Sequence, residues 1–566
     1  LEPWKILTIG RAMILRWPLG TIMDEKDNKV DRKGPPMGSN EWAVAPSRSA
    51  NNVPILLSDP HLTWEGLAVL YEARVHAGEL KMNGFFLIGS PILAIGHNEH
   101  VGWALTTGGP DTADVYEMKV RMKSQLEYEY DGEWKPFKME MYAIGVKGGT
   151  PVFRPALYSH LGPVIEAPDL KKGTALVGAA PLLTMSGMVE QGYAMVTSKT
   201  AEEFFQAVGK GEFNEQNIMF ADVHGTIGYV RCGVTPIRPE GYDWDRPVPG
   251  TTSKTAWKGI HKVEDLVHIF NPPCGYMQNC NISPANMMVD SPFKPEDYKN
   301  YIYNVSWDNE NPRSMRIRDL LSKDDSVTEE EAIAYTMDVY DVHAVRWQTE
   351  LRLAVEGAGK TRMKNLKFAA AVKGILDWDG HFTPEATATS LYESWRMRVG
   401  GEADLSQLKE GGHFDKAQQE KVLGALEKTI DEMESKYGKW DVAWGEIHKV
   451  GRGEQLFPAG GAEFQSGSKE LNFSETLFDV RSKNDEKHPG HFVANSGSMA
   501  MILMFFHKDG IKSYTCTPWG QSGNPESRHY MDQGEKLYSK LQMKPTWWSE
   551  TELKENLEST KELVIK

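Results

Sequence analysis

A serine at position 39 has the surroundings of a candidate nucleophile. It follows Gly38, where a polar run containing Gly and Pro (residues 31–37) gives way to a strand-like alternation that reaches His61. Most Gly-Ser pairs form turns, because both residue types favour turn backbone. A serine hydroxyl also attacks carbonyl carbon when a base takes its proton. The pair alone leaves both interpretations open.

A Gly-rich loop contains a second group of residues that could do chemistry, here metal binding: Asp111, Ala113 and Asp114. Carboxylate and carbonyl oxygens at this spacing suit Ca²⁺. Two aspartates that cap a turn are the alternative interpretation. Residues 357–361 end like a phosphate-binding loop, but Ala354 occupies the position of its first glycine, and residues 97–100 lack the spacing of a zinc-binding H-E-x-x-H.

The composition excludes several classes of protein. The chain has 566 residues, enough for one large core or for two to four domains, and its 40% hydrophobic and 25% charged residues are ordinary for a globular protein. Its net charge of −15 argues against nucleic-acid binding, which requires a basic face. No apolar run approaches the ~18 residues of a membrane span. Four cysteines without a C-x-x-C pair predict neither a zinc site nor a disulfide scaffold.

Short strands with turns must position these groups. Residues 39–120 alternate in the manner of strands, and residues 499–506 predict a buried strand. From about residue 326 the period changes: Thr328 and Glu331 form a capping box. After this capping box, apolar residues recur at three- and four-residue spacing and predict one helical stripe. Further helices are predicted near 365–376, 386–398 and 415–436. The stripe consists of Ile333, Met337, Tyr340, Ala344, Trp347 and Leu351.

The stretch around Ser39 resembles the start of the catalytic β chain of the penicillin acylase family, which are N-terminal-nucleophile amidohydrolases. The resemblance rests on an ensemble that spans essentially the whole chain. Its landmarks are Ser39, Asn40 and Trp42, then Ser47, Arg48 and Ser49, then Asp59, Pro60, His61 and Trp64, with residues 235–239, 247–251, 275–281 and 519–523 further along.

The resemblance implies that a precursor cuts itself between Gly38 and Ser39. Ser39 then carries a free α-amine, whose pKa near 8 lies below that of lysine at about 10. The neutral amine takes the hydroxyl proton, through a water, so nucleophile and base belong to one residue. If the Gly38–Ser39 bond is intact, the chain is an inactive precursor, because an amide nitrogen is not a base.

The family's oxyanion hole implies two donors here, the backbone N–H of Thr107 and the side chain of Asn281, with Asn279 as the fallback. Arg313 matches an arginine that orients the asparagine and lowers the pKa of the amine by charge repulsion. His61 is expected to position Ser39. The acyl pocket implied near the nucleophile is aliphatic, and its residues are Leu62, Ala94, Ile95 and Leu105.

The resemblance adds to the calcium hypothesis. It implies carboxylate ligands from Asp111 and Asp114 and carbonyl ligands from Ala113 and Trp244, with a further ligand from an α chain. No organic cofactor is expected. The implied partners are a small-molecule amide and an α chain from the same precursor, with neither nucleic acid nor membrane, and the implied location is periplasmic or secreted.

The implied fold is α+β: a four-layer αββα sandwich with a helical insertion. Residues 1–38 would be an α-chain tail and linker, with residues 21–38 as linker or spacer. Residues 39–566 would be the catalytic β chain, with core at 39–325 and 437–566 and the insertion at about 326–436. The expected activity is cleavage of a side-chain amide, as in a β-lactam antibiotic. An N-acyl-homoserine lactone or lipopeptide acylase, and a non-catalytic binding protein of the same fold, are the alternatives.

Overall fold

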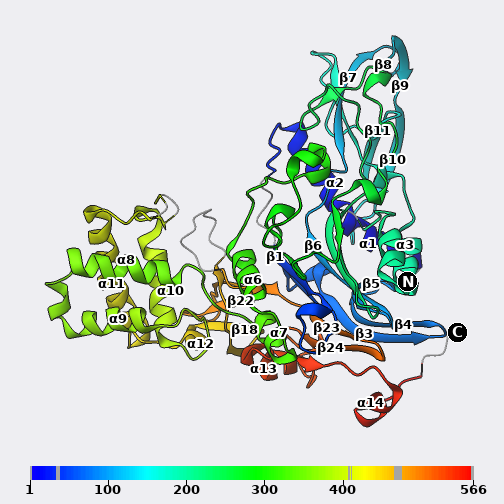
Figure 1. Ribbon diagram of the computed structural model, residues 1–566. Helices are drawn as coiled ribbons and strands as arrows, with labels where there is room; N and C mark the ends of the chain where they lie inside the picture. Colours follow the sequence, from blue (N-terminus) through cyan, green and yellow to red (C-terminus); the bar gives the residue numbers. More distant parts are fainter. Residues whose placement is uncertain are drawn as a thin grey trace.

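A computed structural model describes residues 3–32, 38–213, 215–405, 408–409, 411–464 and 475–562. Two large sheets lie at its centre, a group of helices at one end and a smaller β region at the other (Figure 1). Among the helices of the described residues, none combines the length and apolar character that a membrane crossing requires. The four cysteines are free.

Within the described residues, the first large sheet has 11 strands, and it carries residue 39. Its strand β2 pairs antiparallel with β1, which in turn pairs with β17. β23 is the buried strand predicted at residues 499–506. The strands are β1 (Gly38–Val44), β2 (Ile55–Thr63), β17 (Tyr276–Asn279), β18 (His448–Arg452), β19 (Gln455–Pro458), β20 (Glu463–Phe464), β21 (Val480–Asn484), β22 (Phe492–Ser498), β23 (Met501–His507), β24 (Gly510–Cys516) and β25 (Lys544–Pro545).

The second large sheet has seven strands in the described part of the chain and packs face to face against the first. Gly102 shows how closely they approach: a Cβ at this position would lie 2.8 Å from Sδ of Met504 in β23. One hydrophobic core fills the space between the sheets. The strands are β3 (Leu70–Ala77), β4 (Leu80–Leu87), β5 (Leu93–His97), β6 (Val101–Thr107), β13 (Gln216–Asp222), β14 (Ile227–Cys232) and β16 (His268–Phe270).

Helices cover the outer faces of both sheets. α3 (Met188–Thr197) packs on β4 and β5, and α4 (Ala201–Val208) on β13 and β14. On the other side α6 (Pro312–Lys323) packs against β17 and α7 (Glu329–Thr336) against β23. The remaining short helices are α5 (Asn300–Tyr303), α12 (Trp444–Ile447), α13 (Asp532–Lys536) and α14 (Glu550–Glu555). The fold is thus a mixed α+β fold with several sheets.

The helical segment agrees with the sequence except at one break. The predicted later helices are α9 (Leu366–Asp377), α10 (Thr387–Val399) and α11 (Lys416–Tyr437), and the predicted capping box starts α7. The single stripe is wrong, because α7 ends at Thr336 and α8 (Ala344–Gly357) is a separate helix. Between them the carboxylates of Asp338 and Asp341 accept backbone N–H groups of Tyr340 and His343, bonds that compete with the helix.

The smaller β region contains a five-stranded and a two-stranded sheet. Two N-terminal helices lie beside it (Figure 1), α1 (Pro3–Ile14) and α2 (Arg16–Lys26). α2 occupies residues 21–26, which the sequence assigns to a spacer, and it buries Ile22 and Glu25. The strands are β7 (Asp114–Met122), β8 (Leu126–Tyr130), β9 (Glu133–Pro136), β12 (Thr174–Ala179) and β15 (Val248–Pro249), with β10 (Lys138–Ile144) and β11 (Val152–Tyr158) in the two-stranded sheet.

Candidate active site

Ser39 lies near the start of β1, and it is buried. Its neighbour Gly38 pairs with His61 across to β2. A Cβ on Gly38 would collide with the guanidinium of Arg481 and lie 2.6 Å from Cβ of His61. Only glycine therefore fits before Ser39 without displacing these side chains. The hydroxyl of Ser39 donates to the carbonyl of Gly38, so nucleophile and carbonyl group are in contact.

Asn281 meets Ser39 from a distant part of the chain. Its Oδ1 accepts the backbone N–H of Ser39 at 2.8 Å, and its Nδ2 donates to the carbonyl of Thr107 at 2.9 Å. Asn281 follows the end of β17 and has φ of 64°, a left-handed conformation that asparagine tolerates. The structure therefore brings together the three positions that the sequence assigns to nucleophile and oxyanion hole.

Arg313, near the start of α6, contacts both Ser39 and Asn281. Asn311 caps this helix with its side chain and Pro312 occupies the first turn, which places Arg313 at the end that faces β1. The guanidinium donates to the carbonyl of Ser39 at 2.9 Å and to Oδ1 of Asn281 at 3.3 Å. Its Nε donates to Glu475 at 2.6 Å. Arg313 thus contacts the asparagine it is predicted to orient.

His61 lies beside the Gly38–Ser39 bond, between two carboxylates. Its Nε2 is 3.0 Å from Asp59 and its Nδ1 is 2.8 Å from Asp479. Burial opposes protonation of the imidazole, but Asp59 and Asp479 outweigh it and raise the pKa of His61. These two contacts engage both ring nitrogens with carboxylates and fix His61 as a neighbour of Gly38.

Asn279, the fallback for the oxyanion donor, is used inside its own turn. Its Oδ1 accepts the N–H groups of Asn281 at 2.9 Å and of Ile282 at 3.3 Å, and its Nδ2 donates back to the carbonyl of Ile282. Asn279 is therefore a residue that shapes the turn, whereas Asn281 is the one that reaches Ser39.

Three buried carboxylates, from Glu25, Asp111 and Asp114, lie close enough to hold one metal ion. Burial, with Asp111 and Asp114 nearby, raises the pKa of Glu25 to about 11, and burial raises that of Asp114 to about 7. Among the described residues, one oxygen of Glu25 finds no hydrogen-bond partner. A cation placed there would give that oxygen a partner and reduce the repulsion.

Arg238 already occupies part of the predicted ligand set. Its guanidinium binds the carboxylates of Asp111 at 3.0 Å and Asp114 at 2.9 Å and the carbonyl of Ala113 at 2.9 Å. The indole of Trp244 donates to Pro239 and packs in the core of the smaller β region. One arginine faces three carboxyl groups, so the triad still fits a divalent cation, which would replace the proton that the raised pKa keeps on Glu25. Glu25 is the member of this triad that the sequence does not predict, and its position on the buried face of a helix is the feature that marks it.

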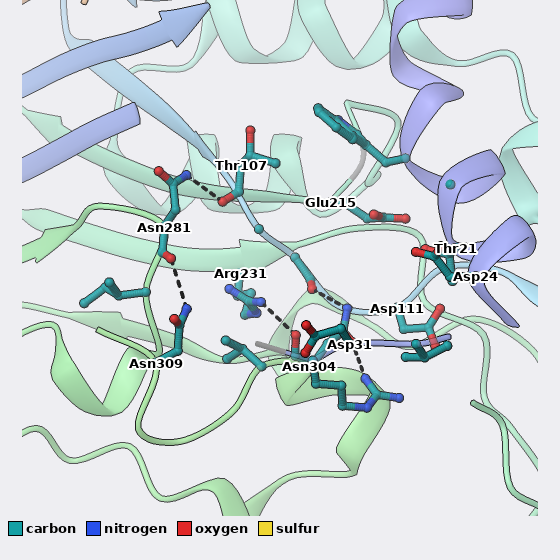
Figure 2. Close-up of a pocket in the computed structure, with 18 of the residues that line it drawn as sticks. Thr21, Asp24, Asp31, Thr107, Asp111, Glu215, Arg231, Asn281, Asn304 and Asn309 are labelled. Atoms are coloured by element: carbon teal, nitrogen blue, oxygen red, sulfur yellow. Dashed lines mark hydrogen bonds between the residues drawn. The ribbon is translucent and has the colours of Figure 1, made fainter. Parts of the chain in front are cut away.

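A polar pocket of about 340 Å³ opens beside Thr107 and Asn281 (Figure 2). Helix α2 forms one wall with Thr21 and Asp24, while Arg231 and Asn309 lie toward the other side. The four predicted acyl-pocket residues do not line it: Leu62, Ala94 and Leu105 pack half-buried against the core and Ile95 is buried within it. An aliphatic acyl pocket at these four positions stays a prediction.

Comparisons with known proteins identify related sequences and folds. The sequence model of the family described as penicillin amidase matches residues 3–555. The chain is 28% identical to penicillin G acylase of Escherichia coli over 44% of its own length and 29% of that protein. It is 23% identical to acyl-homoserine lactone acylase QuiP of Pseudomonas putida over 91% of its length and 66% of that protein. The chain therefore spans less than two thirds of either relative.

Among solved structures, a thermostable penicillin G acylase from Alcaligenes faecalis has the same fold. The TM-score is 0.61 at 20% sequence identity, over 93% of this chain and all of the other. At this identity the similarity concerns the fold, and both kinds of acylase stand among the sequence relatives.

Proposed function

The chain belongs to the penicillin amidase family of N-terminal-nucleophile hydrolases, and from this premise we propose that it hydrolyses the acyl amide of a small molecule through Ser39. The observation that carries the proposal is the convergence of Ser39, Asn281 and Arg313, which are remote in sequence, within hydrogen-bond distance. A fold kept only for binding would not require a nucleophile beside an amide donor and a guanidinium.

Self-cleavage comes first in this proposal. The hydroxyl of Ser39 attacks the carbonyl carbon of Gly38, and the peptide becomes an ester as the C–N bond breaks and the nitrogen takes up a proton. Water then cleaves the ester, which leaves a carboxylate on Gly38 and a free amine on Ser39. The glycine contact with His61 and Arg481 supports the placement of the cut, because it confines the carbonyl that is attacked.

Turnover then uses the new amine as the base. It takes the hydroxyl proton while the oxygen of Ser39 attacks the substrate carbonyl, and it returns the proton to the leaving amine. The backbone N–H of Thr107 and Nδ2 of Asn281 stabilise the oxyanion, after Nδ2 leaves the Thr107 carbonyl it now contacts. Water finally cleaves the acyl-enzyme. The positive charge of Arg313 near Ser39 favours the neutral amine.

Further parts of the proposal concern the assembly. The mature protein is a heterodimer of an α chain that ends before Ser39 and a β chain of residues 39–566, located in the periplasm or secreted. Its core is a four-layer αββα sandwich, an arrangement supported by the helices on the outer faces of the two sheets. A β-lactam side-chain acylase is the first candidate, and the identity to penicillin G acylase supports it.

An acyl-homoserine lactone acylase is the second candidate, since such relatives align with most of the chain.

The test starts with a denaturing mass spectrum of the purified protein, in which we expect a fragment that begins at Ser39. A panel of amides with short aromatic and long aliphatic acyl groups then separates the candidates. A chain that stays uncut and hydrolyses no member of the panel, also after co-expression of an upstream α-chain segment, would instead support a binding protein of the same fold.

The acidic triad is proposed to bind Ca²⁺ through Glu25, Asp111 and Asp114, with a structural role that ties α2 to the start of β7. We expect calcium to raise the unfolding temperature and chelation to lower it. At a concentration 100 times the Kd the stabilisation would be about 2.7 kcal/mol. Glu25→Gln should abolish the calcium-dependent shift in calorimetry. Asp24→Asn is the matched control, because Asp24 is exposed on the same helix outside the triad. Equal shifts in both variants would refute the site.

A further inference from the structure

A row of polar side chains crosses the second sheet directly behind the candidate oxyanion hole. Asn217 in β13 pairs with Thr106 in β6 on one side and with Arg231 in β14 on the other. All three are buried, in a sheet whose inner positions are otherwise mostly apolar. Buried polar groups are normally hydrogen-bonded, so the hydrogen-bond partners of Asn217 indicate the structural role of this row.

The amide of Asn217 has only one possible orientation. Its Oδ1 accepts the hydroxyl of Tyr229 at 2.7 Å and the guanidinium of Arg231 at 2.9 Å. Because both partners are donors, the opposite end of the amide is fixed as the NH₂ group. Asparagine thus presents two donors toward β6 and β17.

Those two donors reach one backbone carbonyl and one side-chain oxygen beside the candidate oxyanion hole. Nδ2 of Asn217 lies 3.3 Å from the carbonyl of Thr107 and 3.3 Å from Oδ1 of Asn279. Asn279 in turn accepts the N–H of Asn281 and so holds the left-handed turn. A continuous chain of hydrogen bonds therefore runs from Arg231 through Asn217 to the residue that meets Ser39.

Gly108 provides a second, independent observation. It follows Thr107 with φ of 135°, and a Cβ at this position would lie 2.7 Å from Nδ2 of Asn217 and 3.2 Å from Nη1 of Arg231. The backbone that leaves Thr107 thus rests directly on the Asn217 amide. Arg231 also lines the polar pocket (Figure 2), so the row connects the pocket wall to the hole.

We propose that Asn217, oriented by Tyr229 and Arg231, is a positioning residue that fixes Thr107 and the Asn281 turn in the geometry of the oxyanion hole. This inference rests on the proposed function for its catalytic meaning. Apart from catalysis, Asn217 fixes the position of Asn281 although the two residues share no direct hydrogen bond.

The decisive variant is Asn217→Asp. It keeps the size and the acceptor for Arg231 and Tyr229 but replaces two donors by a carboxylate oxygen that repels the Thr107 carbonyl and Oδ1 of Asn279. A misplaced donor pair affects the transition state more than substrate binding. We therefore expect kcat to fall about 100-fold, the scale of an error of about 1 Å, with KM within about twofold. Tyr229→Phe, which removes one of the two orienting donors, should show a smaller loss of the same kind.

Asn98→Asp is the matched control. Asn98 is equally buried, its Nδ2 also donates to two carbonyls, and it caps a turn away from Ser39. It should lose stability while kcat stays unchanged. Crystal structures of the two variants give a readout independent of activity: the Asn281–Thr107 hydrogen bond should be displaced in Asn217→Asp and kept in Asn98→Asp.

An unmoved Asn281 in the Asn217→Asp crystal, or a kcat equal to that of the Asn98 control, would overturn the inference. If the unmodified protein neither cuts itself nor hydrolyses any amide, the proposed function fails. The crystal comparison would still decide whether Asn217 positions Asn281.

Discussion

Ser39→Ala is expected to leave the chain uncut after Gly38 and without amide hydrolysis. Both losses have one cause, because the hydroxyl that attacks the Gly38 carbonyl is also the nucleophile of turnover. The change removes one oxygen from a buried side chain and keeps the backbone N–H bond to Asn281, so the fold should survive. A denaturing mass spectrum and an assay with the best amide of the panel measure the two effects.

Ser58→Ala is the control for this experiment. Ser58 is buried in the neighbouring strand, opposite Glu41, and its hydroxyl has no hydrogen-bond partner in the part of the chain that the structure describes. We expect this variant to cut itself and to turn over substrate normally. Hydrolysis that persists in the Ser39 variant would assign the nucleophile elsewhere, and cleavage at the same bond would mean that the cut is not autocatalytic.

Asn281→Ala is expected to lower kcat by about 100- to 1,000-fold, the usual scale for one oxyanion donor. The side chain makes three contacts, with Ser39, Arg313 and Thr107, so its removal also leaves the Ser39 N–H without its acceptor. Self-cleavage should therefore slow as well. Processed enzyme must be isolated before kcat is measured, so that the two effects are separated by mass spectrometry and steady-state kinetics.

Asn271→Ala serves as the comparison for Asn281. Asn271 has a similar left-handed backbone, with φ of 45°, and its side chain likewise accepts a backbone N–H, that of Ile227. It should cost stability through the strained turn without reducing kcat. An undiminished kcat for Asn281→Ala would instead return the role of side-chain donor to Asn279.

Local sequence patterns were sufficient to predict many of the strands and helices. Strands and helices with regular periods were predictable because their apolar spacing is local, and α9, α10 and α11 lie within a few residues of their predicted bounds. The helix break before α8 was not predictable from the same stripe. There, side-chain bonds from Asp338 and Asp341 outweigh an apolar spacing that continues through the break.

The sequence by itself determined the family resemblance and, through it, the identity of Ser39, Thr107, Asn281 and Arg313 as a candidate set. That these positions meet was decided by tertiary structure, since 242 residues separate Ser39 from Asn281 and 174 separate Asn281 from Thr107. Pairing of β1 with β17 closes the first distance, and packing of the second sheet, which carries β6, against β1 closes the second. Such pairing depends on the whole hydrophobic core, which no local window contains.

Only the tertiary structure revealed Glu25 and Asn217. Glu25 lies on a helix 86 residues before Asp111 in the chain, and it joins the acidic triad because α2 packs on β7. Asn217 belongs to no motif, and its role follows from donors on Tyr229 and Arg231 that fix its amide. The physical reason is the same in both cases: a buried polar group acquires its function from the partners that burial forces on it.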